Sequence, residues 1–400
     1  MNPSGIRLSS KVGLIKPSAT MLVTERAAAL RARGVDLIDF GAGEPDFDTA
    51  DHVKNAAAAA IRAGQTKYTP VGGSDALKTA IVTKLQRDNG LSYDKHEVLA
   101  SCGGKHSLFL AFQALFGPSD EVIVPAPYWV SYTDMLMLAG ATPIVVPSSE
   151  DDDFKLRPNV LERSITPRTR AIVLNSPSNP TGAAYEAREL TRLLEVIADH
   201  QLIVISDDVY EMMVYGDFQL AHVLQIRPEL RERTLVVNSV SKTYAMTGWR
   251  IGYTAGPAHI IKAMATLQGQ MTSNPSSIAQ AAAVEALAGP QEGVSEMMHE
   301  FGRRRDFVVQ RLRTMADIRC TLPQGAFYAF PNVSAYLAPH TSLQTGDDLA
   351  AYLIDTAHVA VVGGTDFGSP GHMRISYANS MQNLERGLDR IETALRKLLS

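Results

Sequence analysis

One lysine, Lys242, lies among residues that suit a ligand carrying both an aldehyde and a phosphate. Ser239 and Ser241 flank it on one side, and Arg250 follows eight positions later in a turn-like segment. A lysine amine forms Schiff bases with carbonyls, and hydroxyl and guanidinium groups can hold a phosphate, so the cluster predicts a site for pyridoxal phosphate (PLP). An isolated lysine in a polar loop is more often a solvated side chain. The prediction therefore depends on the rest of the chain.

A carboxylate that could serve the same ligand follows the apolar run 202–206. Asp207 comes directly after this run, and Tyr210 lies three residues further on. A carboxylate at the end of a buried strand needs a partner, and a protonated pyridine nitrogen is such a partner. Tyr210 could donate to the ring oxygen. Alternatively, Asp207 or Asp208 caps a following helix, and two adjacent aspartates allow both roles.

Three more segments supply groups that fit a PLP site. Asn179 is an amide donor within the Pro-rich turn 175–182, which could also be only a rigid turn. Gly104 and Lys105 lead from a strand into a helix, where backbone amides can face an anion. Trp129 follows another strand and could stack on a pyridine ring, although such a residue is more often part of the core.

Arg374 is a candidate for binding a substrate carboxylate. It has apolar neighbours on both sides in the segment 372–377. A buried arginine needs an anionic partner, and its planar fork matches a carboxylate. Alternatively, Arg374 forms a salt bridge within the protein, and the sequence favours neither role over the other.

The elements that must position these residues alternate between strand and helix. Strands alternating with helices, such as 105–116 and 187–200, predict a mostly parallel sheet covered on both faces. In such sheets, ligands bind beyond the carboxyl ends of the strands. The predicted buried strands are 98–101, 121–125, 142–146, 171–175, 202–206, 235–238 and 251–255.

The pattern changes towards both ends of the chain. We expect an N-terminal arm over residues 1–15, a large PLP-binding domain over 51–290, and a small α+β domain built from 16–50 with 291–400. The elements expected outside the central sheet are helices at 51–63, 74–88 and 383–399, and strands at 325–330, 359–362 and 373–377.

Bulk composition excludes several classes of protein. The 400 residues are 45% hydrophobic and 20% charged, and a net charge of −4 gives no electrostatic footprint for nucleic acid. The basic run 303–305 is short and predicts a solvated face or salt-bridge partners. Only two cysteines, Cys102 and Cys320, are present, which excludes a disulfide framework and a multi-cysteine zinc site. With no apolar run of the ~20 residues that span a bilayer, we expect a soluble, cytoplasmic protein without a metal.

Together these residues resemble the class I, fold-type I PLP-dependent aminotransferases. Within that family the chain is similar to the bacterial aspartate aminotransferase subgroup that includes prephenate-active members. The resemblance implies an α/β fold of type I with a mostly parallel seven-stranded sheet and a smaller α+β domain. Its markers are KPSAT (16–20), GEPDFD (43–48), KYTP (67–70), PAPYWVSY (125–132), NSPSNPTG (175–182), SVSKTYAMTGWRIGY (239–253), GAFY (325–328) and RISY (374–377).

The resemblance also implies a role for each site residue. Lys242 would form the Schiff base and then shuttle a proton, while Asp207 pairs with the ring nitrogen. The ring would be held by Tyr210, Asn179 and Trp129, and the phosphate by Ser239, Ser241, Arg250, the amides of Gly104 and Lys105, and Tyr68 of a neighbouring subunit. The substrate α-carboxylate would be bound by Arg374 and Asn179, with Gly43 and Trp129 nearby, and a distal carboxylate by Lys105 and Lys16.

The implied reaction is transamination between an L-amino acid and a 2-oxo acid in a homodimer with shared active sites. Aspartate with 2-oxoglutarate, giving oxaloacetate and glutamate, is the first expectation. A prephenate aminotransferase forming arogenate, or an enzyme with both activities, is the alternative. A non-catalytic PLP-binding regulatory protein is the alternative from another class. The chain departs from the subgroup's usual pattern at Asp208, His106 and residues 363–365, and His106 adjoins a substrate lysine.

Overall fold

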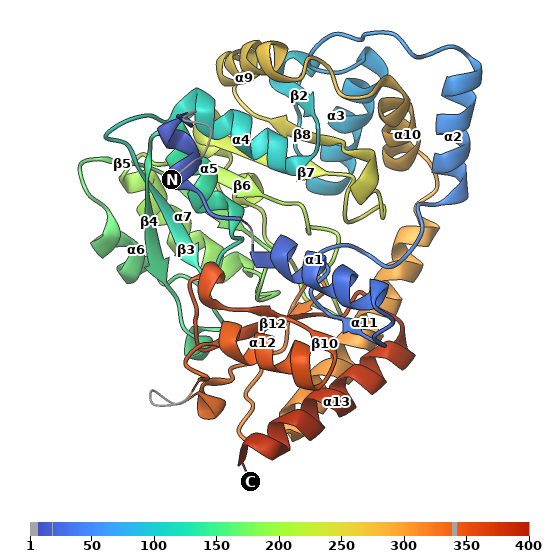
Figure 1. Ribbon diagram of the computed structural model, residues 1–400. Coiled ribbons are helices and arrows are strands. Elements are labelled where there is room, and N and C mark those ends of the chain that lie inside the picture. The colour runs from blue at the N-terminus through green and yellow to red at the C-terminus, as the bar shows by residue number, and fades with distance from the viewer. Residues whose placement is uncertain (1–6, 18, 338–341, 400) are drawn as a thin grey trace.

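The computed structural model describes residues 7–17, 19–337 and 342–399. Residues 1–6 of the predicted N-terminal arm and Ser18 of the first marker lie outside this range. In Figure 1 the large sheet and its helices occupy the upper part of the molecule, and the C-terminal helices occupy the lower part. No helix among the described residues is long and apolar enough to cross a membrane.

The central sheet has seven strands, as predicted. Its spatial order is β2-β8-β7-β6-β5-β3-β4, and only β8 runs antiparallel to its two neighbours. The mostly parallel sheet is therefore confirmed, and each strand begins and ends within two residues of its predicted bounds. The strands are β2 (Val98–Ser101), β3 (Glu121–Ala126), β4 (Thr142–Pro147), β5 (Thr169–Asn175), β6 (Ile203–Asp207), β7 (Thr234–Ser239) and β8 (Gly252–Ala255).

Helices cover both faces of this sheet, which is why its strands are apolar throughout. Along β5, Ala171 and Val173 pack on one face, and Ile172 and Leu174 pack on the other. The first face lies against α4 (Gly104–Leu115), α5 (Ser131–Ala139) and α9 (Ala258–Met271). The second lies against α3 (Asp75–Asn89), α6 (Pro158–Ser164), α7 (Ala187–Asp199), α8 (Val223–Ile226) and α10 (Ser277–Ala288), with α2 (Asp51–Arg62) outside α10.

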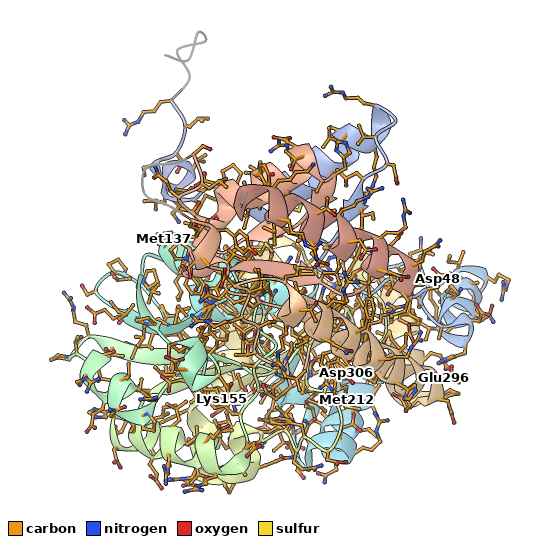
Figure 2. All side chains as sticks on the ribbon, turned by 90° about the horizontal axis from the view of Figure 1, so that it is seen from below. Asp48, Met137, Lys155, Met212, Glu296 and Asp306 are labelled. Carbon is orange, nitrogen blue, oxygen red and sulfur yellow. The ribbon has the colours of Figure 1, made fainter. Side chains whose placement is uncertain are left out.

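The remaining elements form a second hydrophobic core. Short β1 (Ile38–Asp39) pairs in parallel with β10 (Val359–Ala360), and β12 (Met373–Ser376) lies between β11 (Val362–Gly363) and β9 (Tyr328–Ala329). Figure 2 shows α11 from below, with the exposed Glu296 and Asp306 along it. The helices here are η1 (Ser10–Leu14), α1 (Ala19–Ala32), α11 (Glu292–Thr314), α12 (Gly346–Thr356) and α13 (Met381–Leu399).

Two predicted strands in this part were wrong in extent. The strand predicted over 325–330 is only the two residues of β9, and 359–362 divides into β10 and β11, which belong to different sheets. These two-residue strands are too short for the local sequence pattern to determine where they begin and end, so pairing with distant strands determines their bounds. The basic run 303–305 does supply salt-bridge partners: Arg304 is buried and pairs with Asp46 and Glu300. The domain boundaries near residues 50 and 290 stay a prediction.

Candidate active site

A cavity of about 250 Å³ opens beyond the carboxyl ends of β5, β6 and β7, where the strand-end rule places ligands. Most of the residues that the sequence suggested line it. They are Gly43, Gly104, Lys105, Trp129, Asn179, Asp207, Tyr210, Ser239, Ser241, Lys242, Arg250 and Arg374.

Lys242 lies inside the cavity with its amine against the backbone. Its Nζ donates a hydrogen bond to the carbonyl oxygen of Gly43. Burial lowers the pKa of Lys242 to about 8, against the attraction of Glu44 and with help from the positive charges of Arg374 and Arg250. About a tenth of the amine is therefore neutral at pH 7, and that form can attack a carbonyl.

This pKa predicts how the free protein reacts with an aldehyde. Reductive methylation by formaldehyde, followed by peptide mass spectrometry, should modify Lys242 with a rate that rises through pH 8 and then levels off. Lys54 is the control, because its hydrogen bond to Asp51 raises its pKa above 10.5 and its labelling should still be rising beyond pH 10. Identical pH profiles for the two lysines would contradict the prediction.

Asp207 is the buried last residue of β6, with its carboxylate held by neutral donors. The hydroxyl of Tyr132 donates to Oδ2 at 2.6 Å, and the amide of Val209 donates to Oδ1 at 3.3 Å. Burial raises the pKa of Asp207 to about 6, although both hydrogen bonds oppose the rise. The carboxylate is thus mostly ionised at neutral pH and pairs with no cation among the described residues, so it can accept a protonated ring nitrogen.

The helix-capping alternative for Asp207 and Asp208 is wrong, because the chain forms a turn rather than a helix over residues 209–212. Tyr132 was not assigned a role from the sequence. It lies in the marker 125–132, three residues after Trp129, and that spacing was the available signal.

One end of the cavity is shaped to receive an anion. It is formed by the N-terminus of α4, which has no acidic residue in its first turn, and by Ser239, Ser241 and Arg250. Gly103 is favoured here by its φ of 95°, and a Cβ on it would also displace the Arg250 guanidinium, whose Nη2 would lie 2.3 Å away. The Arg250 guanidinium donates to the carbonyls of Thr247 and Cys102 and has no acidic partner in the described chain. Helix amides, two hydroxyls and an uncompensated guanidinium can together hold a phosphate.

Arg374 marks the opposite side of the cavity and is 1% exposed. Its guanidinium donates to Oδ1 of Asn179 at 3.0 Å and to the carbonyl oxygen of Gly41 at 2.8 Å, while Nε has no partner. The described residues offer it no ion pair, so they do not contain the internal salt bridge that was the alternative. Burial lowers the pKa of Arg374. A buried guanidinium with only neutral partners is ready to bind an incoming carboxylate.

Aromatic side chains complete the walls. The Lys105 amine lies 5.0 Å from the centre of the Trp129 ring, and burial lowers the pKa of Lys105. Tyr210 and Tyr328 share a hydrogen bond of 2.8 Å, and the Tyr328 ring lies 4.5 Å from the Arg374 guanidinium. Tyr328 belongs to the marker 325–328 but had been given no role. Other lining residues missed in the sequence are Met21, Leu108, Ser131, Asn175, Val209 and Thr247.

Two of the predicted residues lie outside the cavity. Tyr68 is 90% exposed, in the segment between α2 and α3. Lys16 is exposed, in the segment between η1 and α1. A single chain therefore does not bring either side chain to the site.

Comparison with known proteins agrees with this geometry. The family model for class I and II aminotransferases matches residues 35–391. The chain is 46% identical to an aspartate aminotransferase of Geobacillus stearothermophilus over 96% of its length and 98% of that protein's. It is 49% identical to an aspartate/prephenate aminotransferase of Cereibacter sphaeroides, with the same coverage of 96% and 98%.

Solved structures give the same result. The crystal structure of the aspartate aminotransferase from Rhizobium meliloti matches with a TM-score of 0.94 and 46% identity over 98% of this chain and 99% of that one. The Thermus thermophilus aspartate aminotransferase with maleate matches with a TM-score of 0.91 and 42% identity over 97% of this chain and 100% of that one. The resemblance inferred from the sequence is confirmed: this chain belongs to the class I and II aminotransferase family.

Proposed function

We propose that this aminotransferase binds PLP in the cavity and transfers the amino group of L-aspartate to 2-oxoglutarate, giving oxaloacetate and glutamate. The observation that carries the proposal is the position of Lys242. Its amine of lowered pKa lies in one cavity with an anion cradle, formed by the start of α4, Ser239, Ser241 and Arg250, and with the buried guanidinium of Arg374, which makes no ion pair with the described residues.

The residues present fit PLP. The cradle at the start of α4 would take the phosphate through Ser239, Ser241, Arg250 and the amides of Gly104 and Lys105. Asp207 would hold the ring nitrogen, Tyr210 and Asn179 the ring oxygen, and Trp129 would stack on the ring. When bound, PLP supplies an electron-withdrawing ring that stabilises negative charge on the substrate α-carbon.

The side chains of this protein would then handle protons and orientation. Neutral Lys242 Nζ removes the proton from the substrate α-carbon and later returns one, and a pKa of about 8 keeps this base close to working pH. The Asp207 carboxylate, held in place by Tyr132, keeps the ring nitrogen protonated. Arg374 and Asn179 bind the α-carboxylate, beside the Gly43 backbone, and so orient the bond to be broken.

A dicarboxylic substrate is favoured by the cation next to Trp129. Lys105 lines the cavity and can meet a distal carboxylate. Lys16 would have to move with the segment before α1 to assist it. Relatives are named aspartate aminotransferases, and one was solved with maleate, a dicarboxylate.

Prephenate is the second candidate substrate, because relatives at 49% and 47% identity are named aspartate/prephenate aminotransferases. An enzyme that acts on both aspartate and prephenate would agree with the names of both groups of relatives. A PLP-binding regulator without catalysis remains the alternative from another class.

We also propose a homodimer in which the site is completed by Tyr68 of the second subunit. The 90% exposure of this aromatic side chain supports an interface at Tyr68. The cytoplasm is the proposed location, supported by two cysteines that are both free.

Half-reaction spectra test the substrate. The PLP-loaded protein is mixed with aspartate, glutamate or arogenate, and the amine form is then mixed with 2-oxoglutarate, oxaloacetate or prephenate. We expect aspartate and glutamate to convert the cofactor spectrum and 2-oxoglutarate and oxaloacetate to restore it. If only arogenate and prephenate convert the cofactor spectrum, the enzyme is a prephenate aminotransferase, the second candidate. No conversion by any amino acid would favour the regulator.

A further inference from the structure

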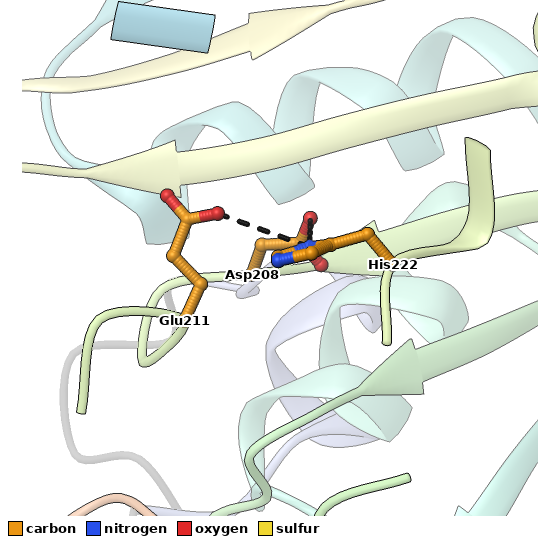
Figure 3. Close-up of side chains that lie close together, drawn as sticks. All are labelled: Asp208, Glu211 and His222. Atoms are coloured by element: carbon orange, nitrogen blue, oxygen red, sulfur yellow. Dashed lines mark ion pairs between the residues drawn. The ribbon is translucent and has the colours of Figure 1, made fainter. Parts of the chain in front are cut away.

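A buried group of ionisable side chains lies directly behind the cavity, on the other face of the sheet. Figure 3 shows Asp208, Glu211 and His222 close together, with His222 Nδ1 3.5 Å from Asp208 and 3.9 Å from Glu211. Their spacing would suit a metal ion. The oxygens are already used, however, because Lys84 Nζ donates to Glu211 and Ser206 donates to Asp208. Lys84 thus supplies an ammonium to this group, and Asp208 raises the pKa of His222 despite its burial.

The group extends to the anion cradle through one amide side chain. Glu211 accepts hydrogen bonds from two amides, Asn89 Nδ2 at 2.6 Å and Asn238 Nδ2 at 2.7 Å. A carboxylate can only accept here, so it fixes which end of Asn238 faces it. The Asn238 Oδ1 consequently points the other way and accepts from the backbone amide of Ser239 at 2.7 Å.

This contact holds the backbone of Ser239, and a second contact holds its hydroxyl. Ser239 Oγ accepts from the backbone amide of Ser241 at 3.2 Å. The hydroxyl proton of Ser239 has no acceptor among the described residues, so it is available for donation, and both serines line the cavity. A line of hydrogen bonds therefore runs from Lys84 through Glu211 and Asn238 to the cradle.

We propose that Glu211 and Asn238 are positioning residues for the phosphate cradle: they hold the Ser239 backbone so that its hydroxyl donates to a bound phosphate. The proposal rests on PLP binding in the cavity. Neither residue touches the cavity, so their effect must pass through Ser239. Their effect on ligand affinity should therefore appear with ligands that carry a phosphate and not with ligands that carry only the aldehyde and the ring.

The test compares PLP with pyridoxal, which lacks the phosphate, on the full-length apoprotein. Dissociation constants are measured by absorbance for wild type and Asn238→Ala, with inorganic phosphate alone as a third probe by thermal shift. We expect Asn238→Ala to raise the dissociation constant of PLP about tenfold. This is the effect of losing one hydrogen bond that holds a phosphate-binding residue in place. Pyridoxal affinity should change less than about threefold, and the stabilisation by phosphate should shrink.

Asn89→Ala is the matched control. Asn89 donates to the same carboxylate and is equally buried, 2% exposed against 3% for Asn238, but it has no contact with Ser239. Its loss should lower the stability of the protein and leave the ratio of the pyridoxal and PLP dissociation constants unchanged. If Asn238→Ala does not fold, Asn238→Ser is measured in the same way.

The outcomes separate this inference from the proposed function. Wild type that binds PLP no tighter than pyridoxal would mean that the phosphate cradle itself is wrong. Wild type that prefers PLP, together with an unchanged ratio in the Asn238 variant, would overturn only the positioning role. If Asn89→Ala lowered the ratio of the pyridoxal and PLP dissociation constants by as much as Asn238→Ala, the positioning role would also be overturned. A general loosening of the buried group would then explain both results.

Discussion

Replacing Lys242 with alanine should abolish transamination and remove the visible absorbance of bound PLP. In the proposed function the amine is both the Schiff-base partner and the base that moves the α-proton, so two functions would be lost with one side chain. We expect the turnover number with aspartate and 2-oxoglutarate to fall by at least about 10⁴-fold. Steady-state assays of the purified variant, with its absorbance spectrum, measure both effects.

Folding of this variant can be separated from its activity. The Lys242 side chain is half-buried and its pKa is lowered, so its charge is a cost to the folded state at neutral pH, and its removal should not lower the melting temperature. Lys54→Ala, at an exposed lysine on α2, is the control that should keep full activity. An active Lys242→Ala protein would overturn the assignment of the whole site.

The central sheet could be predicted because its signal is local. Each strand is a short run of buried Val and Ile between turn residues, and alternate side chains such as Val173 and Leu174 supply the cores of the two faces. The two-residue strands of the smaller part carry no such run. β10 and β11 are adjacent in sequence but pair with different partners, and only the folded chain decides this.

The candidate site could be predicted where it follows from strand ends. Asp207 and Ser239 end neighbouring parallel strands, so one edge of the sheet brings them together. Contacts between side chains far apart in the sequence could not be predicted. The bond from Tyr132 to Asp207 spans 75 residues, and that from Lys84 to Glu211 spans 127. Spacing along the chain gives no measure of such pairings, and the role proposed for Tyr68 would require a second chain.

Arg374→Ala should remove most of the enzyme's ability to use amino acids while leaving PLP in place. The guanidinium is buried, and its hydrogen bonds within the described residues go to the neutral Asn179 and Gly41, so a substrate carboxylate would be its anionic partner. Losing a buried charge-assisted fork should lower kcat/KM for aspartate about 10²–10³-fold. Arg374→Lys keeps the charge but not the fork and should recover only part of the loss. Steady-state kinetics measure kcat/KM, and the absorbance spectrum reports bound PLP.

A second buried arginine shows what a purely structural role would look like. Arg304 is 6% exposed, against 1% for Arg374, but its charge is neutralised by Asp46 and Glu300. Arg304→Ala leaves Asp46 without its partner and Glu300 with Arg303 alone, so it should destabilise the protein by about 3 kcal/mol in denaturant unfolding. Its kcat/KM per folded molecule should stay near that of wild type. Arg374→Ala should show the reverse pattern, because no ion pair within the described chain is broken. If both variants lost stability and kept kcat/KM, Arg374 would be a core residue and the α-carboxylate would have to bind elsewhere.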